Sequence, residues 1–173
     1  MRFYNIKEEY IQFLKQYDNT VANNKEESRP YIGTIVEING YKYYAPFTSP
    51  KSKHKNMRNT LDFRKIDNGN LGAINLNNMI PVVDDALIPI DFNKITDFNY
   101  KRLLQKQYIA INKDKHGIIT TAQKLHKLLF LSSKSTTPAQ QRIISRCCII
   151  YLYLKKNVNS IRRDRLSIFS AQT

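Results

Sequence analysis

The sequence contains few acidic residues for its size. Fourteen Asp and Glu stand against 28 Lys and Arg, which gives the 173-residue chain a net charge of +14 at pH 7. A field of this sign attracts polyanions and speeds their encounter with the protein. Nucleic acid is therefore the leading candidate partner, and an anionic membrane surface is a weaker alternative.

Long apolar runs and cysteines are also scarce. The longest apolar run, CCIIYLYL, has eight residues, whereas a membrane-spanning helix needs roughly 20. The start of the chain lacks the apolar centre of a signal peptide, so we expect no export by that route. The only cysteines, Cys147 and Cys148, are adjacent, and adjacent cysteines rarely bridge each other. We therefore expect core thiols, no disulfide framework and a location in the reducing cytoplasm.

Spacings typical of metal sites are absent from the sequence. His54, His116 and His126 are scattered, with no HxxxH or HExxH spacing. Asp84 and Asp85 form the only tight acidic pair, and neighbouring residues on a strand point to opposite faces. A solvated loop is the favoured interpretation of this pair. We therefore expect no metal and no cofactor, so any cleavage of phosphodiesters would be metal-independent.

The first half of the chain has the patterns of strands. Hydrophobic residues make up 42% and aromatic residues 11% of the sequence, enough for an ordered core. Residues 2–6 predict a strand and residues 7–18 a helix with Tyr10, Phe13, Leu14 and Tyr17 on one face. The next stretch, residues 19–28, is polar and predicts a loop. The residues that follow predict two hairpins. One joins residues 29–38 and 41–47 through the turn Asn39-Gly40, and the other joins residues 61–66 and 71–76 through the turn DNGN. Short strands are expected within residues 78–90.

In the first hairpin, Ile32, Thr34, Val36 and Ile38 are expected to share one strand face. From about Asp97 the pattern becomes helical. The expected stripes of three helices are Leu103, Leu104, Tyr108 and Ile111, then Leu125, Leu128 and Leu129, then a run from Ile143 to Leu152 after Pro138. We predict an α+β fold in one domain spanning residues 1–173, with a β core at about 1–95 and a helical part at about 96–173.

One stretch, APFTSPKSKHKN at residues 45–56, concentrates groups that could act on RNA. It has three lysines, one histidine and three hydroxyls, and no acidic residue. Metal-free RNA cleavage needs a group to take the proton of the attacking 2′-OH, a proton for the leaving 5′-oxygen, and positive charge near the phosphorane. The stretch supplies hydroxyl, ammonium and imidazole groups. A solvated basic turn carries equal weight from composition alone.

Five blocks, in this order, resemble one family. They are FYNI at residues 3–6, the helix from Tyr10 to Asp18, YIG at 31–33, YxxPxTSPKxxH at 43–54 and LGAINLNNMIPV at 71–82, followed by YKRLLQKQY at 100–108. The sequence resembles the endoribonuclease toxins of type III toxin–antitoxin systems, the ToxN/AbiQ-like family. The similarity covers roughly the first 110 residues and fades in the last third.

The resemblance implies a compact antiparallel barrel-like β core related to MazF and Kid. It implies metal-independent cutting of adenine-rich RNA that leaves a 2′,3′-cyclic phosphate and a 5′-hydroxyl. It also implies inhibition by a small repeat pseudoknot RNA antitoxin in a cyclic toxin–RNA assembly, and a role in abortive infection against phage.

The family's site residues map onto five positions of this sequence. Ser49 would donate to a phosphate oxygen or position the 2′-OH, and Thr48 would assist it or hold the loop. Lys51 would stabilise charge on the phosphorane, and Arg29 would grip a phosphate. His54 is suited to proton transfer, with a role in structural orientation as an equal alternative. A further tyrosine found in some relatives has no clear counterpart in residues 23–28.

Other residues are weaker candidates for contact with RNA. These are Tyr31, Lys53, Lys55, Lys101, Arg102, Lys106 and the basic tail at residues 155–166. Tyr31 could stack on a base, although core packing is favoured. Three other functions stay open: a non-catalytic RNA-binding protein, a membrane-surface protein with a basic amphipathic helix, and a MazF-type toxin neutralised by a protein.

Overall fold

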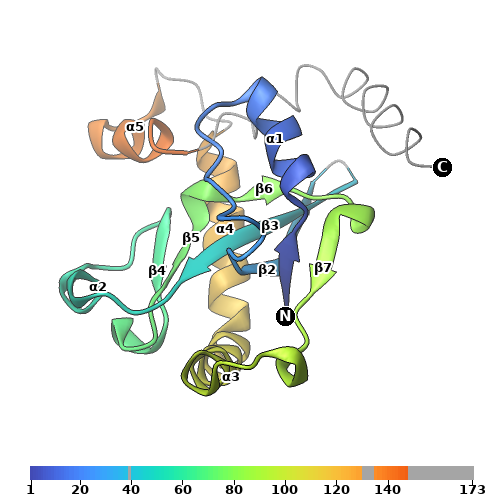
Figure 1. Cartoon of the computed structure of the whole chain (residues 1–173). Helices are drawn as coiled ribbons and strands as arrows, with labels where there is room; N and C mark the ends of the chain where they lie inside the picture. Colours follow the sequence, from blue (N-terminus) through green and yellow to red (C-terminus); the bar gives the residue numbers. More distant parts are fainter. Residues whose placement is uncertain (39, 130–134, 148–173) are drawn as a thin grey trace.

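The computed structural model describes residues 1–38, 40–129 and 135–147, and it places an antiparallel β-sheet at the centre with helices around it (Figure 1). This confirms the α+β prediction. The strands are β1 Arg2–Ile6, β2 Tyr31–Ile38, β3 Tyr41–Thr48, β4 Phe63–Lys65, β5 Ala73–Asn75, β6 Ile80–Pro81 and β7 Leu87–Pro89.

Strand pairing follows the order β4-β5-β3-β2-β1-β7, and β6 also pairs with β3. β3 is thus the most connected strand, since β2, β5 and β6 all pair with it. Within the described residues the path is open, because β4 and β7 end it without pairing with each other. The expected barrel-like closure is not observed, and the relation to MazF and Kid stays a prediction.

Both predicted hairpins are present. β2 pairs with β3 and β4 with β5, each antiparallel. Gly40 has a φ of 77°, as a tight turn requires, while Asn39 lies outside the described residues. The prediction that Ile32, Thr34, Val36 and Ile38 share one face of β2 is wrong, because the register with β3 shifts between Ile32 and Val36. Thr34 is consequently exposed and Ile35 buried.

The helices are α1 Glu8–Tyr17, α2 Ser52–Asn56, α3 Phe98–Lys113, α4 Lys115–Leu129 and α5 Pro138–Ile144. In α1, Tyr10, Phe13 and Leu14 are buried as their spacing predicts. The short helix α2 was not predicted, because its sequence is polar throughout. α4 packs against β2 and crosses behind the sheet, with α3 below it (Figure 1).

The predicted stripes of α3 and α4 are largely confirmed. Leu104 and Ile111 of α3 are buried, and so are all three leucines of the α4 stripe. The prediction that Tyr108 belongs to the buried stripe is wrong, since 37% of its surface is exposed. Gln107, three residues after Leu104, takes the buried place instead, because positions i and i+3 share a helix face.

One charged cluster joins the sheet to the helices. The Arg64 guanidinium of β4 donates from Nη2 to Asp114 Oδ1 at 2.6 Å and from Nε to Oδ2 of the same carboxylate. It also donates from Nη1 to Thr121 Oγ1 of α4 at 3.1 Å. Asp114 lies between α3 and α4, so this cluster fixes the corner of the two helices against β4.

The C-terminal third is described only in part. Cys147 is buried, which agrees with a core thiol, whereas Cys148, the apolar run to Leu152 and the basic tail at 155–166 lie outside the described residues. No helix among the described residues combines the length and apolarity needed to cross a membrane.

Candidate active site

A cavity of about 470 Å³ opens where β3 ends. Its walls come from β1, the segment before β2, the end of β3 with the residues that follow it, the segment after β7, and α3. The lining residues are Asn5, Lys25, Ser28, Arg29, Pro30, Phe47, Thr48, Ser49, Lys51, Ile90, Ile95, Tyr100, Leu104 and Gln107.

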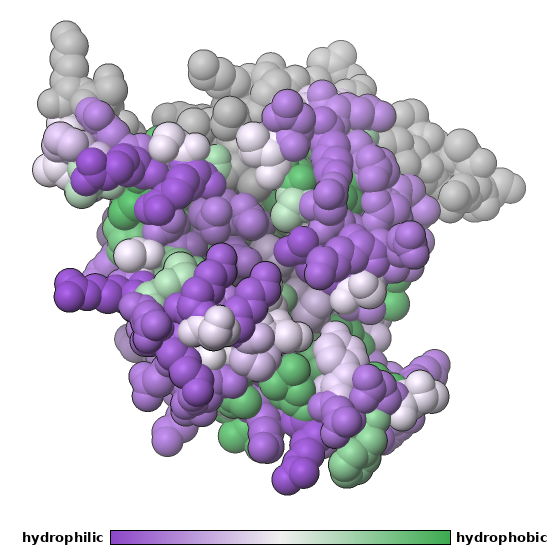
Figure 2. Space-filling model, turned by 60° about the vertical axis from the view of Figure 1, so that its left-hand side comes forward, coloured by the Kyte–Doolittle hydropathy of each residue, from purple (hydrophilic) through white to green (hydrophobic). Residues whose placement is uncertain are grey.

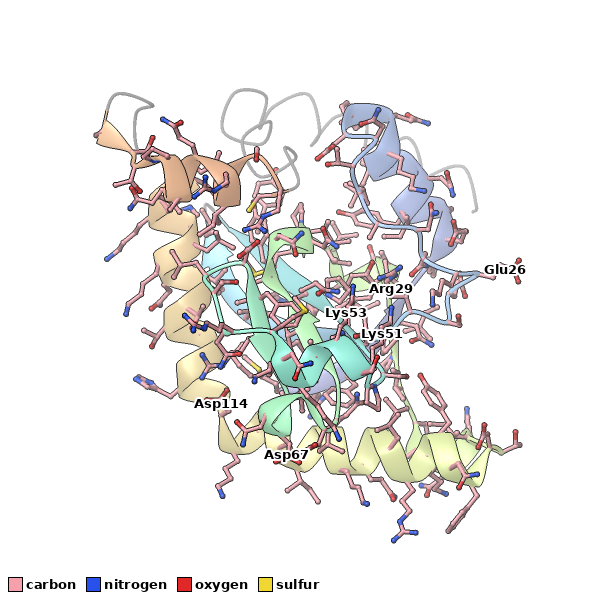
Figure 3. The ribbon with its side chains drawn as sticks, turned by 90° about the vertical axis from the view of Figure 1, so that its left-hand side faces the viewer. Glu26, Arg29, Lys51, Lys53, Asp67 and Asp114 are labelled. Atoms are coloured by element: carbon pink, nitrogen blue, oxygen red, sulfur yellow. The ribbon has the colours of Figure 1, made fainter. Side chains whose placement is uncertain are left out.

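Four of the five residues predicted to be catalytic line this cavity: Arg29, Thr48, Ser49 and Lys51. They come from segments about 20 residues apart in the sequence, which the β2–β3 pairing brings together. Figure 3 shows Arg29 and Lys51 on neighbouring segments of one face, while Glu26 points away from them. The geometry therefore gathers one guanidinium, one ammonium and two hydroxyl groups at a single opening.

The end of β3 is held in place by a close contact with the residue before β5. Thr48 pairs with Ala73, and Gly72 lies beside the Thr48 carbonyl with a φ of 107°. A Cβ on residue 72 would come within 1.9 Å of that oxygen, so only glycine fits. The Thr48 hydroxyl is buried and has no hydrogen-bond partner within the described part of the chain, so it lies beneath the surface of the cavity and is not exposed in it.

Gln107 of α3 is a site residue that the sequence analysis missed. It is 1% exposed, and its Nε2 donates to the Thr48 carbonyl at 3.2 Å and to the Leu71 carbonyl at 2.6 Å. Its carboxamide thus ties α3 to the end of β3 and to the turn before β5. The one available signal was a polar residue on the buried stripe of a helix.

His54 lies in α2 and contacts Lys51 through the backbone. Its Nδ1 accepts from the Lys51 N–H at 3.3 Å, and its own N–H donates to the Lys51 carbonyl at 2.9 Å. Burial, followed by the positive charges of Lys51 and Lys53, lowers the pKa of His54. The contact with the Lys51 backbone is what an orientation role requires, and proton transfer by His54 stays a prediction with equal weight.

Arg29 is anchored by the loop that precedes β2. Its N–H donates to the Asn24 carbonyl at 3.1 Å, and its Nε donates to the Asn23 carbonyl at 2.5 Å. The preceding residues 25–27 all have φ between 52° and 62°, a left-handed conformation that is rare for side-chain-bearing residues. This turn directs Arg29 to the cavity, with its two terminal nitrogens unpaired within the described residues.

A second cavity of about 460 Å³ adjoins the first and shares Thr48 and Lys51 with it. Lys53, Arg58 and Arg146 give this second cavity a basic lining, although Arg146 also pairs with Asp62 at 3.1 Å. Hydrophilic side chains cover most of the face that carries α2 (Figure 2). Thr48 and Lys51 therefore lie where the two cavities adjoin, with basic residues in the lining of both.

The structure separates the other residues predicted to contact RNA. Tyr31 is 1% exposed, so the prediction that it stacks on a base is wrong and the core-packing alternative holds. Lys53 lines the second cavity, and Lys55 is exposed on the same helix α2. The three residues of α3 that were predicted to contact RNA, Lys101, Arg102 and Lys106, line neither cavity. Contact between them and RNA stays a prediction.

Comparison with known proteins gives consistent relatives. A family described as "Toxin ToxN, type III toxin-antitoxin system" matches residues 2–158. The chain is 38% identical over 127 residues to Endoribonuclease ToxN of Pectobacterium atrosepticum, covering 66% of this chain and 74% of the relative. It is 32% identical over 151 residues to Endoribonuclease ToxN of Bacillus thuringiensis subsp. kurstaki, and the match covers 85% of this chain and 77% of the relative.

Solved structures show the same fold. One, described as selective toxin inhibition by a non-coding RNA pseudoknot, has a TM-score of 0.76 at 27% identity and covers 93% of this chain and 97% of its own. Another, of the lactococcal anti-phage endoribonuclease AbiQ, has a TM-score of 0.71 at 25% identity and covers 91% and 95%. Since the family match extends over most of the sequence, the chain belongs to the ToxN family of type III toxin–antitoxin toxins.

Proposed function

We propose that this chain is a cytoplasmic, metal-independent endoribonuclease toxin that cuts adenine-rich RNA. As a member of a family whose curated relatives are endoribonucleases, it is an RNA-cleaving enzyme. The observation that carries the mechanism is the convergence of Arg29, Thr48, Ser49 and Lys51 on one cavity. Those groups offer hydrogen bonds and positive charge to a phosphodiester.

The proposed reaction is an attack by the ribose 2′-OH on its own phosphate. O2′ loses its proton to a base as the bond from O2′ to phosphorus forms, the bond from phosphorus to the 5′-oxygen breaks, and the departing oxygen takes up a proton, so no proton is gained or lost overall. The products are a 2′,3′-cyclic phosphate and a 5′-hydroxyl. Lys51 and Arg29 stabilise the negative charge of the phosphorane, the Ser49 hydroxyl donates to one of its oxygens, and Thr48 assists Ser49 or holds the loop.

The same cavities are proposed to bind the inhibitor. A solved relative is described as inhibited by a non-coding RNA pseudoknot, and another belongs to an antiviral system regulated by a processed non-coding RNA. We extend this to a repeat RNA antitoxin bound in a cyclic assembly, and to abortive infection against phage. An RNA with phosphates like those of the substrate would inhibit by occupying the cavity.

The proposal is tested with purified, RNA-free protein and a 5′-labelled adenine-rich RNA in excess EDTA. We expect cutting to persist in EDTA and the upstream fragment to end in a cyclic phosphate. Ser49→Ala and Lys51→Ala should each lower the rate by at least roughly 100-fold, the scale of losing one preorganised donor to the transition state.

A matched control is Lys94→Ala, which removes an exposed lysine outside both cavities. It should cut at the wild-type rate. If Ser49→Ala and Lys51→Ala also cut at that rate, the cavity is not the active site. Dependence on added divalent metal would contradict the metal-independent mechanism.

A further inference from the structure

The lining of the first cavity is of two chemical kinds. One kind is polar and includes the groups proposed to act on phosphate, Ser49, Lys51 and Arg29. The other kind is apolar or aromatic: Phe47, Ile90, Ile95, Tyr100 and Leu104. A cavity of about 470 Å³ has the volume of a small-molecule site. It is larger than a phosphate group needs, and its apolar lining suits a flat ring.

Asn5 lies in this cavity without a protein partner. It is the penultimate residue of strand β1, where its backbone pairs with Ile88 of β7. Asparagine is depleted in strands because it packs poorly on a pleated surface. The Asn5 side chain is half-buried and lines the cavity, and nothing in the described part of the chain hydrogen-bonds to its carboxamide.

The other carboxamide in the cavity is already occupied. Gln107 uses Nε2 to hold the carbonyls of Thr48 and Leu71, so its donor is not available to a ligand. Asn5 alone of the two offers both a free donor and a free acceptor. A carboxamide pairs with adenine by accepting from the N6 amine and donating to a ring nitrogen, N7 in the usual bidentate arrangement.

We infer that this cavity binds an adenine base adjacent to the cut phosphate against its apolar lining, and that Asn5 reads the N6 amine and N7 of that base. The flat purine would lie against the apolar walls while its polar edge meets the carboxamide. The inference rests on the proposed RNA-cleaving function and makes Asn5 a residue that determines the substrate base.

The test combines base analogues with variants of Asn5. Adenosines flanking the cut are replaced one at a time by purine riboside, which lacks the N6 amine, or by 7-deazaadenosine, which lacks N7. At one position, wild-type protein should cut each analogue roughly 10- to 100-fold more slowly than adenosine. Asn5→Ala should lower the rate on adenosine to the analogue level and lose the discrimination.

Asn5→Asp gives a second and sharper readout. Its carboxylate keeps an acceptor for the N6 amine but loses the donor to N7. It should therefore still discriminate against purine riboside and no longer against 7-deazaadenosine. The readout is the rate on each analogue divided by the rate on adenosine for the same variant. A general loss of activity or stability lowers both rates and leaves this ratio unchanged. Asn99→Ala, an exposed position on α3, serves as control and should discriminate like wild type.

Two outcomes would overturn different claims. If wild-type protein does not cut the all-adenosine RNA, the proposed function is wrong and the inference is overturned with it. If wild type cuts that RNA and Asn5→Ala still discriminates at every flanking adenosine, the function stands and Asn5 does not read the base.

Discussion

At the scale of the single residue, the Thr48 carbonyl is the atom on which the geometry of the site depends. Gln107 Nε2 donates to it, and Gly72 leaves the space beside it. Ser49 follows directly in the chain, so any shift of this carbonyl displaces the proposed catalytic hydroxyl. Gln107 therefore acts as a positioning residue.

Gln107→Leu tests this role. The substitution leaves two partly buried carbonyls without this donor, at a cost of up to about 1–3 kcal/mol for an unsatisfied group, and it releases the end of β3. We expect kcat to fall roughly 10- to 100-fold, the scale of a small misplacement, with little change in KM. Gln105→Leu, on the exposed face of α3, is the matched control, and an equal loss there would contradict the account.

His54 makes the stability of the folded protein depend on pH. Its pKa in the folded protein is lowered below the ordinary value of 6.5, first by burial and then by Lys51 and Lys53. Between those two pKa values the unfolded chain binds more protons than the folded one. The contribution of His54 to the free energy of unfolding is therefore fully present above pH 6.5. It is lost as the pH falls from 6.5 to the lowered pKa of the folded protein.

His54→Asn should weaken this dependence, because asparagine offers an acceptor to the Lys51 N–H without titrating. Part of the dependence should remain, since burial also lowers the pKa of His126. The measurement is the denaturant midpoint from pH 5 to pH 7.5 for wild type and variant. Curves that stay parallel over this range would show that His54 is not the titrating group.

The sequence identified Arg29, Thr48, Ser49 and Lys51 correctly as neighbours only because their motifs resemble a family. Local patterns alone left the stretch from 45 to 56 equally compatible with a solvated turn. The contacts of Gln107 with Thr48 and Leu71 were beyond prediction, because they join segments that no spacing rule relates. Tyr31 failed as a stacking residue because burial is decided by the tertiary structure.

At the scale of secondary structure, the link between β4 and the α3–α4 corner depends on Arg64. Its side chain is 20% exposed and engages Asp114 through two nitrogens. Bidentate pairs of this kind are stronger than ordinary surface ion pairs. Arg64→Leu should lower the free energy of unfolding by about 1–2 kcal/mol. At temperatures well below its melting temperature, the variant should still cut RNA.

The exposed pair Lys42–Asp84 provides the comparison. Its nitrogen and oxygen are 2.9 Å apart, and both side chains are largely open to solvent. Lys42→Ala should leave the unfolding midpoint unchanged within error. A larger loss for Lys42→Ala than for Arg64→Leu would contradict this ranking.

Elements with strong local signals were predicted well. The two hairpins followed from their turn residues, and α1, α3 and α4 from apolar spacing. The face of β2 was predicted wrongly because a register shift between Ile32 and Val36 leaves no trace in the alternation of residue types. Helix α2 is short and polar, and its reciprocal contacts with Lys51 depend on the final structure.

At the scale of the whole molecule, a net charge of +14 should make RNA binding strongly salt-dependent. Each phosphate neutralised on a single strand contributes about −0.7 to the slope of log K against log salt. With Ser49→Ala to prevent cutting, a Lys53→Ala, Lys55→Ala variant should have a slope shallower by roughly 1 to 1.4.

The same measurement with Arg102→Ala, Lys106→Ala tests the basic residues of α3. Those residues line neither cavity, so a smaller change of slope is expected for a short substrate. An equal or larger change would place the RNA path across α3. The single-domain organisation of residues 1–173 and the role of the C-terminal third also belong to this scale and stay predictions.

The central claim is that the cavity at the end of β3 promotes attack by the ribose 2′-OH. The most direct measurement uses two RNAs that differ by one atom, the 2′-oxygen of the nucleotide immediately 5′ of the cut. We predict that the protein cuts the ribonucleotide in EDTA, leaves a cyclic phosphate and does not cut the 2′-deoxy substrate there. Cutting of both RNAs at that position would contradict the account, because no attack by a 2′-OH is possible on the second.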